Sequence, residues 1–288
     1  MNGRLYIVAT PIGNLGDMTT RAVEILREVD IIAAEDTQNS MTLLSKFDIK
    51  TRLVSSHKFN ETGSAEYFIK ELLNGKNIAV ISDAGTPCIS DPGNVLVKKA
   101  IENNIEVTSI PGACAAAAAV AVSGFDIKSF VFEGFFPREN KEIKKLTEKL
   151  KNNTGVYIFY ESPRRIIKTL EVFAEQLPDN NCDVCLCNDL TKKFERIYRG
   201  SPAEVLCELK ENPSAEKGEY TIVVDVSGIN NNENKFIQSI ESIIVDVMIK
   251  NKITVKDAVK FIALDNSYDL NKNEIYAASL NLKKLFGN

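Results

Sequence analysis

The segment SDAGTPCISDPG, residues 82–93, decides how the first half of this chain folds. It follows the short apolar run NIAVI, whose β-branched residues predict a buried strand. A connection from a strand to the next helix usually takes about 2–6 residues, and this one takes twelve. Its glycine, proline, aspartate and serine residues favour specific backbone turns and do not fill a hydrophobic core. This composition indicates a loop with a function beyond connecting a strand to a helix.

Strand and helix patterns alternate on both sides of this loop. The expected strands are residues 5–10, 30–36, 52–56, 77–83 and 105–111, and the expected helices are residues 20–29, 41–47, 64–75 and 94–104. Such alternation implies an α/β fold with a largely parallel sheet and helices on both of its faces. We therefore expect residues 1–113 to form an N-terminal α/β domain.

The pattern of the next part of the chain, residues 114–228, predicts a second α/β domain. An alanine-rich segment at 112–125 favours a closely packed helix. The strand patterns are denser here, and we expect some of the strands to be antiparallel; they lie at 129–135, 155–162, 182–190, 194–200 and 219–226. Helices are expected at 137–151, at 164–177 and within 202–210.

The end of the chain predicts a linker followed by helices. Residues 228–236 have the composition of a linker. Residues 236–288 follow as a small helical C-terminal domain, which contains a helix, a turn and a second helix, with Thr254 and Asn271 as expected N-caps.

The length and composition of the chain indicate the general class of protein. The chain has 288 residues, 44% of them apolar and 26% charged, which is typical of a soluble globular protein with more than one domain. No apolar run is long enough to span a bilayer, and the first apolar run lacks the features of a signal peptide, so we expect a cytoplasmic protein without a membrane partner.

The net charge and the cysteines give only weak evidence about nucleic-acid binding and metal sites. The net charge of −4 argues mildly against nucleic-acid binding, but residues 137–151 carry six Lys or Arg against three Glu. A solvated helix face explains that segment equally well. Cys182, Cys185 and Cys187 lie far in sequence from the single histidine, His57, so we read them as small strand residues and expect no metal site.

Four unusual loops follow expected strands, at 10–20, 34–40, 82–93 and 111–115. In an open parallel sheet, ligands bind beyond the carboxyl ends of the strands, so these loops together predict a ligand crevice. None of them has the glycine pattern that cradles the phosphates of a dinucleotide or a nucleoside triphosphate. Asp83, at the end of its strand, is suited to accept hydrogen bonds from a ribose hydroxyl or an ammonium group.

Several long motifs occur in one order: LYIVATPIGNLGDMT, IIAAEDT, SDAGTPCISDPG, IPGACA, FEGFFPR, FYESPRR and KGEY. Together they resemble the bacterial methyltransferase family that 2′-O-methylates a cytidine in the decoding region of small-subunit (16S) ribosomal RNA. That family belongs to the tetrapyrrole methylase superfamily. The resemblance covers about residues 4–228, and the helical tail is also similar.

The resemblance implies two α/β domains of the tetrapyrrole methylase type, S-adenosylmethionine as cofactor in the cleft between them, and a homodimer. The residues that it implies for cofactor binding are Pro11, Asp83, Ala84, Gly85, Thr86, Ala113, Cys114, Ala115 and Tyr220. For contact with ribosomal RNA we expect Glu161, Arg164, Arg165, Lys144 and Lys145. Among these, the arginines and lysines are suited to pair with phosphates.

The sequence departs from the family's usual motifs at several positions. Gln38 stands where the family has Arg, Ala113 and Cys114 replace Pro and Ser, Arg164 replaces His, and Asn188 and Asp189 replace Arg and Glu. Two of these changes remove an arginine and one adds one. They are compatible with cofactor binding, and they leave the details of the RNA contact open.

The implied reaction is an in-line displacement by a ribose 2′-oxygen on an activated methyl group, which needs no metal. Weak candidates for a general base are Glu35, Asp36 and His57, although Asp36 is equally suited to cap the helix that follows. Two alternatives stay open: a methyltransferase of the same fold that acts on a tetrapyrrole or a protein side chain, and a non-catalytic ribosome-binding protein.

Overall fold

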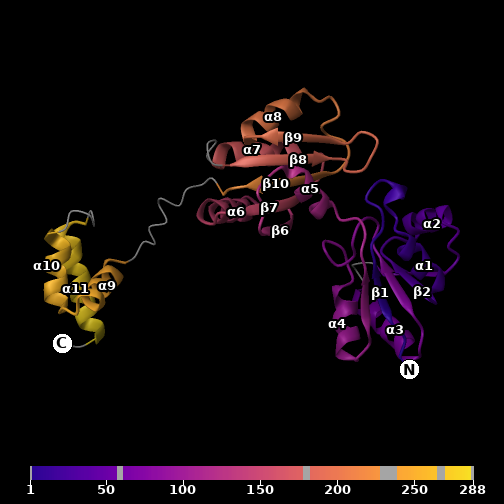
Figure 1. The fold of residues 1–288 in the computed structure, drawn as a ribbon, viewed down its shortest axis with the longest axis horizontal. Coiled ribbons are helices and arrows are strands. Elements are labelled where there is room, and N and C mark those ends of the chain that lie inside the picture. Colours follow the sequence, from indigo (N-terminus) through magenta and orange to yellow (C-terminus); the bar gives the residue numbers. More distant parts are fainter. Residues whose placement is uncertain (1, 57–60, 178–181, 228–238, 265–269, 287–288) are drawn as a thin grey trace. The chain divides into compact units, whose positions relative to one another are not determined.

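The computed structural model describes residues 2–56, 61–177, 182–227, 239–264 and 270–286 (Figure 1). The chain divides into two compact units, Met1–Ile229 and Asn230–Asn288. Among the described residues, the first unit holds two five-stranded sheets, and the second holds three helices. The border that we expected between residues 113 and 114 falls in the connection between the first sheet and the helix that follows it.

The first sheet is parallel throughout and has the strand order β3-β2-β4-β1-β5. Its strands are β1 (Leu5–Val8), β2 (Ile31–Ala34), β3 (Arg52–Ser55), β4 (Ile78–Ile81) and β5 (Val107–Ile110). The connecting helices are α1 (Thr20–Glu28), α2 (Thr37–Lys46), α3 (Glu61–Leu73) and α4 (Asn94–Glu102), with a short 3₁₀ helix, η1 (Leu15–Asp17), before α1. The expected α/β alternation is confirmed.

Helices cover both faces of this sheet. Leu26 of α1 and Leu44 of α2 pack with Ile32 on one face. Phe68 of α3 and Leu96 of α4 belong to the core on the opposite face. All four residues of β2 and all four of β4 are buried, as expected for central parallel strands with a helical layer on each side.

The strand order places β1 beside β4 at the centre of the sheet. From β1 the chain moves to β2 on one side, and from β4 it moves to β5 on the other side. This reversal is a topological switch point, beyond whose carboxyl ends a ligand crevice is expected. The loops that follow β1 and β4 therefore become the first candidates for a site.

The second sheet is mixed, as its sequence predicted, with the order β6-β7-β10-β8-β9. Its strands are β6 (Phe130–Phe135), β7 (Val156–Glu161), β8 (Asp183–Asn188), β9 (Arg196–Gly200) and β10 (Tyr220–Asp225). Only the β6–β7 pair is parallel. The helices are α5 (Ala115–Ser123), α6 (Asn140–Asn152), α7 (Ile166–Gln176) and α8 (Pro202–Glu211).

The two faces of the second sheet are covered unequally. The core of one face includes residues of α6, α7 and α8, among them Leu150, Phe173 and Leu209. On the other face the alanine-rich α5 packs through Ala116 and Ala119 against Cys185 and Cys187. The two thiols are buried there as small strand residues, as expected.

The C-terminal unit consists of α9 (Ile240–Asn251), α10 (Val255–Leu264) and α11 (Lys272–Phe286), with a core of its own. Both expected caps are confirmed. The Thr254 hydroxyl accepts a hydrogen bond from the backbone N–H of Asp257 at 3.3 Å, and Asn271 Oδ1 accepts one from Asn273 at 3.0 Å. No helix in the described part of the chain is both long enough and apolar enough to cross a membrane.

Candidate functional site

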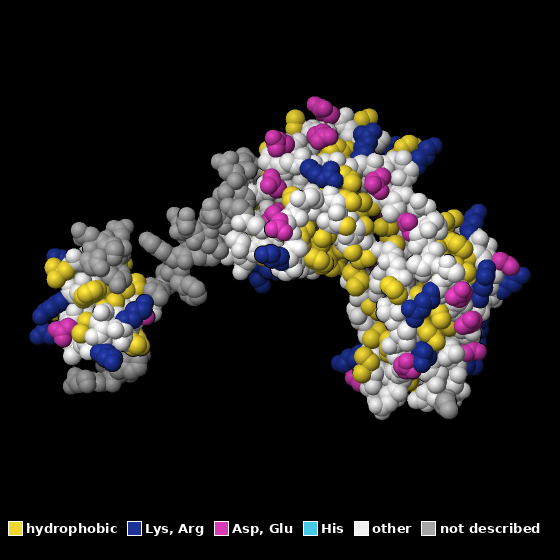
Figure 2. Space-filling model, in the orientation of Figure 1, with side chains coloured by type: hydrophobic (Ala, Val, Ile, Leu, Met, Phe, Trp, Pro, Cys, Tyr) yellow, Lys and Arg dark blue, Asp and Glu magenta, His cyan; other side chains and the backbone are white. Residues whose placement is uncertain are grey.

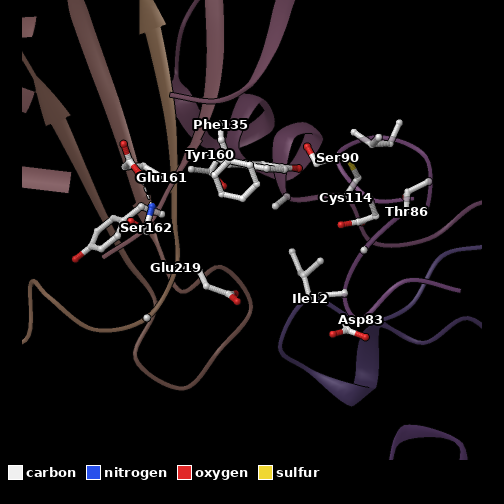
Figure 3. Close-up of a pocket in the computed structure, with 18 of the residues that line it drawn as sticks. Ile12, Asp83, Thr86, Ser90, Cys114, Phe135, Tyr160, Glu161, Ser162 and Glu219 are labelled. Carbon is white, nitrogen blue, oxygen red and sulfur yellow. Dashed lines mark hydrogen bonds between the residues drawn. The ribbon is translucent and has the colours of Figure 1, made fainter. Parts of the chain in front are cut away.

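A cavity of about 500 Å³ opens beyond the carboxyl ends of β1 and β4, between the loops of the first sheet and the edge of the second (Figure 3). The first sheet, its loops and the start of α5 contribute Ile12, Asp83, Ala84, Gly85, Thr86, Ile89, Ser90, Asp91, Cys114 and Ala115. The second sheet and its loops contribute Phe135, Tyr160, Glu161, Ser162, Pro163, Gly218, Glu219, Tyr220 and Thr221. The predicted crevice is therefore present at the switch point.

The long 82–93 loop forms one wall of this pocket because it turns back on the end of β1. The backbone N–H of Thr10 donates to the carbonyl of Gly85 at 2.9 Å, and the N–H of Gly85 donates to the carbonyl of Thr10 at 3.0 Å. Gly85 has φ +78°, a left-handed conformation that glycine adopts readily. The Thr86 hydroxyl then donates to the carbonyl of Ala113 at 3.1 Å. Three loops are thus joined into one continuous wall.

The carboxylate of Asp83 is held at the start of α2. It accepts a hydrogen bond from the backbone N–H of Asp36 at 3.3 Å and another from the Asn39 amide at 3.1 Å. Asp36 itself caps α2, since its side chain accepts from the backbone N–H groups of Gln38 and Asn39. This cap also explains why α2 begins at Thr37, four residues before the expected start.

Of the three sequence candidates for a general base, the two that belong to the described residues do not line the pocket. Neither Glu35 nor Asp36 lines it, and Asp36 has the capping role that was the alternative interpretation. His57 lies outside the described residues.

Four carboxylates line the pocket, and three of them have firm partners. Glu161 is fully enclosed and accepts from the Thr169 hydroxyl at 2.7 Å, with Arg165 at 3.2 Å. Glu219 is 73% exposed and pairs with Lys192 at 2.9 Å. Asp83 is held by α2, as described above. Asp91, the fourth, takes part in none of the ion pairs of the described residues.

The environment of Asp91 changes its proton affinity. Burial, the largest effect, raises the pKa of its carboxyl; a hydrogen bond with Ser82 works in the opposite direction, and the negative charge of Asp83 raises the pKa further.

Two tyrosines of the second sheet complete the wall. The hydroxyl oxygen of Tyr160 accepts from the backbone N–H of Ala116, in the first turn of α5, at 3.2 Å. Burial raises the pKa of Tyr160 to about 12, so the phenol is neutral at physiological pH. Tyr220 is buried and donates its hydroxyl hydrogen to the carbonyl of Ala215 at 2.8 Å. Both side chains are therefore fixed in place.

Seven of the nine residues expected at a cofactor site line this pocket: Asp83, Ala84, Gly85, Thr86, Cys114, Ala115 and Tyr220. The other two do not. Pro11 is buried beside the pocket, where its neighbour Ile12 forms the lining instead. Ala113 contributes only its backbone carbonyl, as the acceptor for Thr86.

Sequence reasoning missed several lining residues. Asp91 and Ser90 lie within the loop that it singled out, but their position in the loop gave no sign of which way they point. Phe135 is the last residue of β6 and Tyr160 the last but one of β7, and they belong to two quoted motifs, FEGFFPR and FYESPRR. Their place at strand ends on the edge that meets the first sheet was the available signal.

The residues expected to contact RNA fall into two groups. Arg164, Lys144 and Lys145 are exposed. Arg165 instead donates to the carbonyls of Phe136 and Pro137 at 3.0 and 2.7 Å and pairs with Glu161.

The expectation for Glu161 needs correction. Its side chain is fully enclosed between Thr169 and Arg165, so the carboxylate does not reach a surface that RNA could approach. The described residues contain no group of three or more side chains placed to hold a metal ion.

Comparison with known families gives one match that covers most of the chain. The family model for tetrapyrrole (corrin/porphyrin) methylases matches residues 4–206. These residues include both sheets except β10, and all the pocket-lining loops up to β9.

Curated relatives extend the similarity into the C-terminal unit. The ribosomal RNA small subunit methyltransferase I of Buchnera aphidicola subsp. Acyrthosiphon pisum is 40% identical over 276 residues, which cover 95% of this chain and 95% of that protein. The protein of the same name from Bacillus subtilis is 42% identical over 281 residues and covers 96% of this chain and 94% of its own length.

Solved structures share the fold at lower identity. A cobalt precorrin-4 methyltransferase from cobalamin biosynthesis has a TM-score of 0.58 at 15% identity and covers 79% of this chain and 96% of its own. A uroporphyrin-III C-methyltransferase from Thermus thermophilus, complexed with S-adenosyl homocysteine, has a TM-score of 0.55 at 12% identity and covers 77% of this chain and 97% of its own.

Proposed function

Since the chain belongs to the family of tetrapyrrole (corrin/porphyrin) methylases, we propose that it transfers a methyl group from S-adenosylmethionine to the 2′-hydroxyl of a cytidine in small-subunit ribosomal RNA. One observation carries the choice of substrate. The relatives named ribosomal RNA small subunit methyltransferase I are 40–42% identical to this chain over 95–96% of its length, whereas the two solved tetrapyrrole methyltransferases described above are 12–15% identical over 77–79% of it.

The pocket suits the proposed cofactor. Its volume of about 500 Å³ lies within the range of about 300–1,000 Å³ that is usual for small-molecule sites. Asp83 and Glu219 are acceptors for the ribose hydroxyls or the ammonium group. Ala84, Gly85 and Ala115 are small and leave room for the adenosine part.

The bound cofactor would supply a methyl group already activated by a positively charged sulfur. The chain's own contribution is to hold that group and the ribose hydroxyl in line, and such alignment is worth up to about 7–11 kcal/mol. The fixed side chains of Tyr160 and Tyr220 keep the wall rigid, and Phe135 adds an apolar surface that excludes water.

The function is tested by incubating the purified chain with labelled S-adenosylmethionine and small ribosomal subunits that lack the modification. We expect label in the 16S RNA, recovered as 2′-O-methylcytidine after nuclease digestion. Label that enters a ribosomal protein or an added tetrapyrrole would support the same-fold alternatives. Subunit binding without any transfer would support the non-catalytic one.

The role of the 82–93 loop is tested at Gly85. A side chain there would meet Ile12 Cγ2 at 3.3 Å in the pocket wall and would force a left-handed residue. Gly124→Val is the matched control, because Gly124 has φ +82° with nothing within 4 Å. Both variants should lose about 1–2 kcal/mol of stability from the backbone alone. Only Gly85→Val should lower S-adenosylmethionine affinity, by more than tenfold in calorimetry; equal affinities would remove the loop from the site.

The proposed RNA surface lies next to the pocket. Arg164 is exposed and directly follows Pro163, a residue of the pocket wall. On the loop between β8 and β9, Phe194 is 72% exposed, and Lys193 Nζ lies 5.4 Å from the centre of its ring. An exposed aromatic ring beside a cation suits a stacked base and its phosphate.

Arg164 and Arg165 should differ when each is changed to Ala. Arg164→Ala should weaken RNA binding. It should also make the slope of log affinity against log salt concentration less steep by about 0.7–0.9, the value for one lost phosphate contact. Arg165→Ala should mainly lower the melting temperature, because it removes the contacts to Phe136, Pro137 and Glu161. Lys98→Ala, an exposed change on α4, is the control. A salt slope unchanged in Arg164→Ala would place the RNA contact elsewhere.

We also propose a homodimer formed through the second sheet. The outer strand β6 and the end of α5 expose large apolar side chains: Val122 (37%), Phe130 (47%), Val131 (44%) and Phe135 (61%). Figure 2 shows hydrophobic side chains gathered on the face where β6 and α5 lie. An apolar edge strand is usually covered by another chain or element. A second copy of the chain would cover the exposed apolar side chains of β6. Phe135, which lines the pocket, would then lie both in the interface and in the pocket wall.

The dimer is tested by light scattering during gel filtration. Wild type should have twice the mass of one chain, and Val131→Glu should shift it to a monomer because a charge would be buried in the contact. Ile101→Glu, a change at a 62% exposed position on α4, should leave the mass unchanged. A monomeric wild type would refute the proposal.

A further inference from the structure

One carboxylate of the pocket stands apart from the other three. Asp83, Glu161 and Glu219 are each held by an amide, a hydroxyl or a cation. Asp91 has the Ser82 hydroxyl as its neighbour, and it belongs to none of the ion pairs formed among the described residues. An ionised carboxylate that is partly buried without a countercharge is costly, so such a group in a pocket is a candidate for a chemical role.

The surroundings of Asp91 come from three segments. Asp83 and Ser82 lie on its own loop, Cys114 lies at the start of α5, and Tyr160 lies at the end of β7. The Tyr160 phenol is neutral, and its oxygen already accepts from the backbone of Ala116, so it does not compete as a base. Asp83 is the nearby negative charge, and it increases the tendency of Asp91 to accept a proton.

We propose that Asp91 is the general base that removes the proton from the attacking 2′-hydroxyl. The proposal rests on the proposed function. In this step the hydroxyl oxygen forms a bond to the methyl carbon while the bond from that carbon to sulfur breaks. The sulfur keeps the electron pair and becomes a neutral thioether. The hydroxyl proton passes to the carboxylate of Asp91 and then to solvent.

The same placement gives Asp91 a preference between cofactor and product. S-adenosylmethionine and S-adenosylhomocysteine share the adenosine and the amino acid part, and they differ in the methyl group and the positive charge on sulfur. A carboxylate beside the reacting centre favours the charged sulfur. A carboxylate that contacts the ribose or the ammonium group would favour both molecules equally.

The test compares Asp91→Asn with wild type and with Asp48→Asn, a change at an exposed aspartate after α2. Asp91→Asn should lower kcat on small subunits by about 10²–10⁴-fold, the usual contribution of a general base. In wild type, kcat should rise with pH as the Asp91 carboxyl loses its proton, and Asp91→Asn should lack that rise. Thermal melting checks the fold, and Asp91→Ala replaces the variant if the Asn form is unstable.

Calorimetry gives a second readout that needs no turnover. In wild type the ratio of S-adenosylmethionine to S-adenosylhomocysteine affinity should fall as pH drops through the pKa of Asp91, because the carboxylate loses its charge. In Asp91→Asn the ratio should be lower and independent of pH. Asp48→Asn should behave as wild type.

Three results would overturn the assignment: unchanged kcat in Asp91→Asn, an equal loss of affinity for both molecules, or a wild-type affinity ratio that does not respond to pH. If the proposed function itself is wrong, the wild-type chain will not methylate the subunits at all. The calorimetric ratio then still decides whether Asp91 faces the sulfur.

Discussion

The pair of hydrogen bonds between Thr10 and Gly85 is the constraint on which the rest of the site depends. It joins the carboxyl ends of β1 and β4, the two strands at which the connections of the first sheet change direction. Without these hydrogen bonds, the twelve residues from Ser82 to Gly93 would form a long loop without a defined conformation, because ordering it would cost a large conformational entropy. With these hydrogen bonds, the loop forms a pocket wall whose side chains have defined positions.

Several features of the pocket follow from that wall. Thr86 is brought within reach of the Ala113 carbonyl, which fixes the start of α5 relative to the loop. The first turn of α5 then supplies the backbone N–H to which Tyr160 of the second sheet is bound. A chain of contacts therefore runs from the centre of the first sheet to the end of β7. Three of the carboxylates that line the cavity have other partners: α2 holds Asp83, Thr169 holds Glu161 and Lys192 holds Glu219. Asp91 is the exception that gives the site its proposed chemistry.

Much of this arrangement could be predicted from the sequence, because periodicity and turn residues report local structure. The alternating pattern of the first half, the mixed second sheet and the caps at Thr254 and Asn271 are all local signals. The loop 82–93 was identified as part of a site because its length and composition exceed what a turn needs. Asp36 was correctly weighed as a cap, although the start of α2 that this cap implies was placed too late.

The parts that could not be predicted depend on contacts between distant segments. Nothing in the motif FYESPRR distinguishes the exposed Arg164 from Arg165, which is bound by the carbonyls of residues almost thirty positions earlier. The enclosure of Glu161 likewise requires α7, through Thr169, to pack over the strand end. Pro11 and Ile12 are neighbours, and only the turn of the backbone decides which one faces the cavity.

The proposed chemistry requires the cofactor to occupy this pocket. A crystal structure of the protein with S-adenosylhomocysteine tests this most directly. We expect density for one molecule per chain between the 82–93 loop and β10, with its polar groups near Asp83 and Glu219 and its sulfur facing Asp91. Density that lies outside this cavity, or that turns the sulfur away from Asp91 toward another carboxylate, would contradict this expectation.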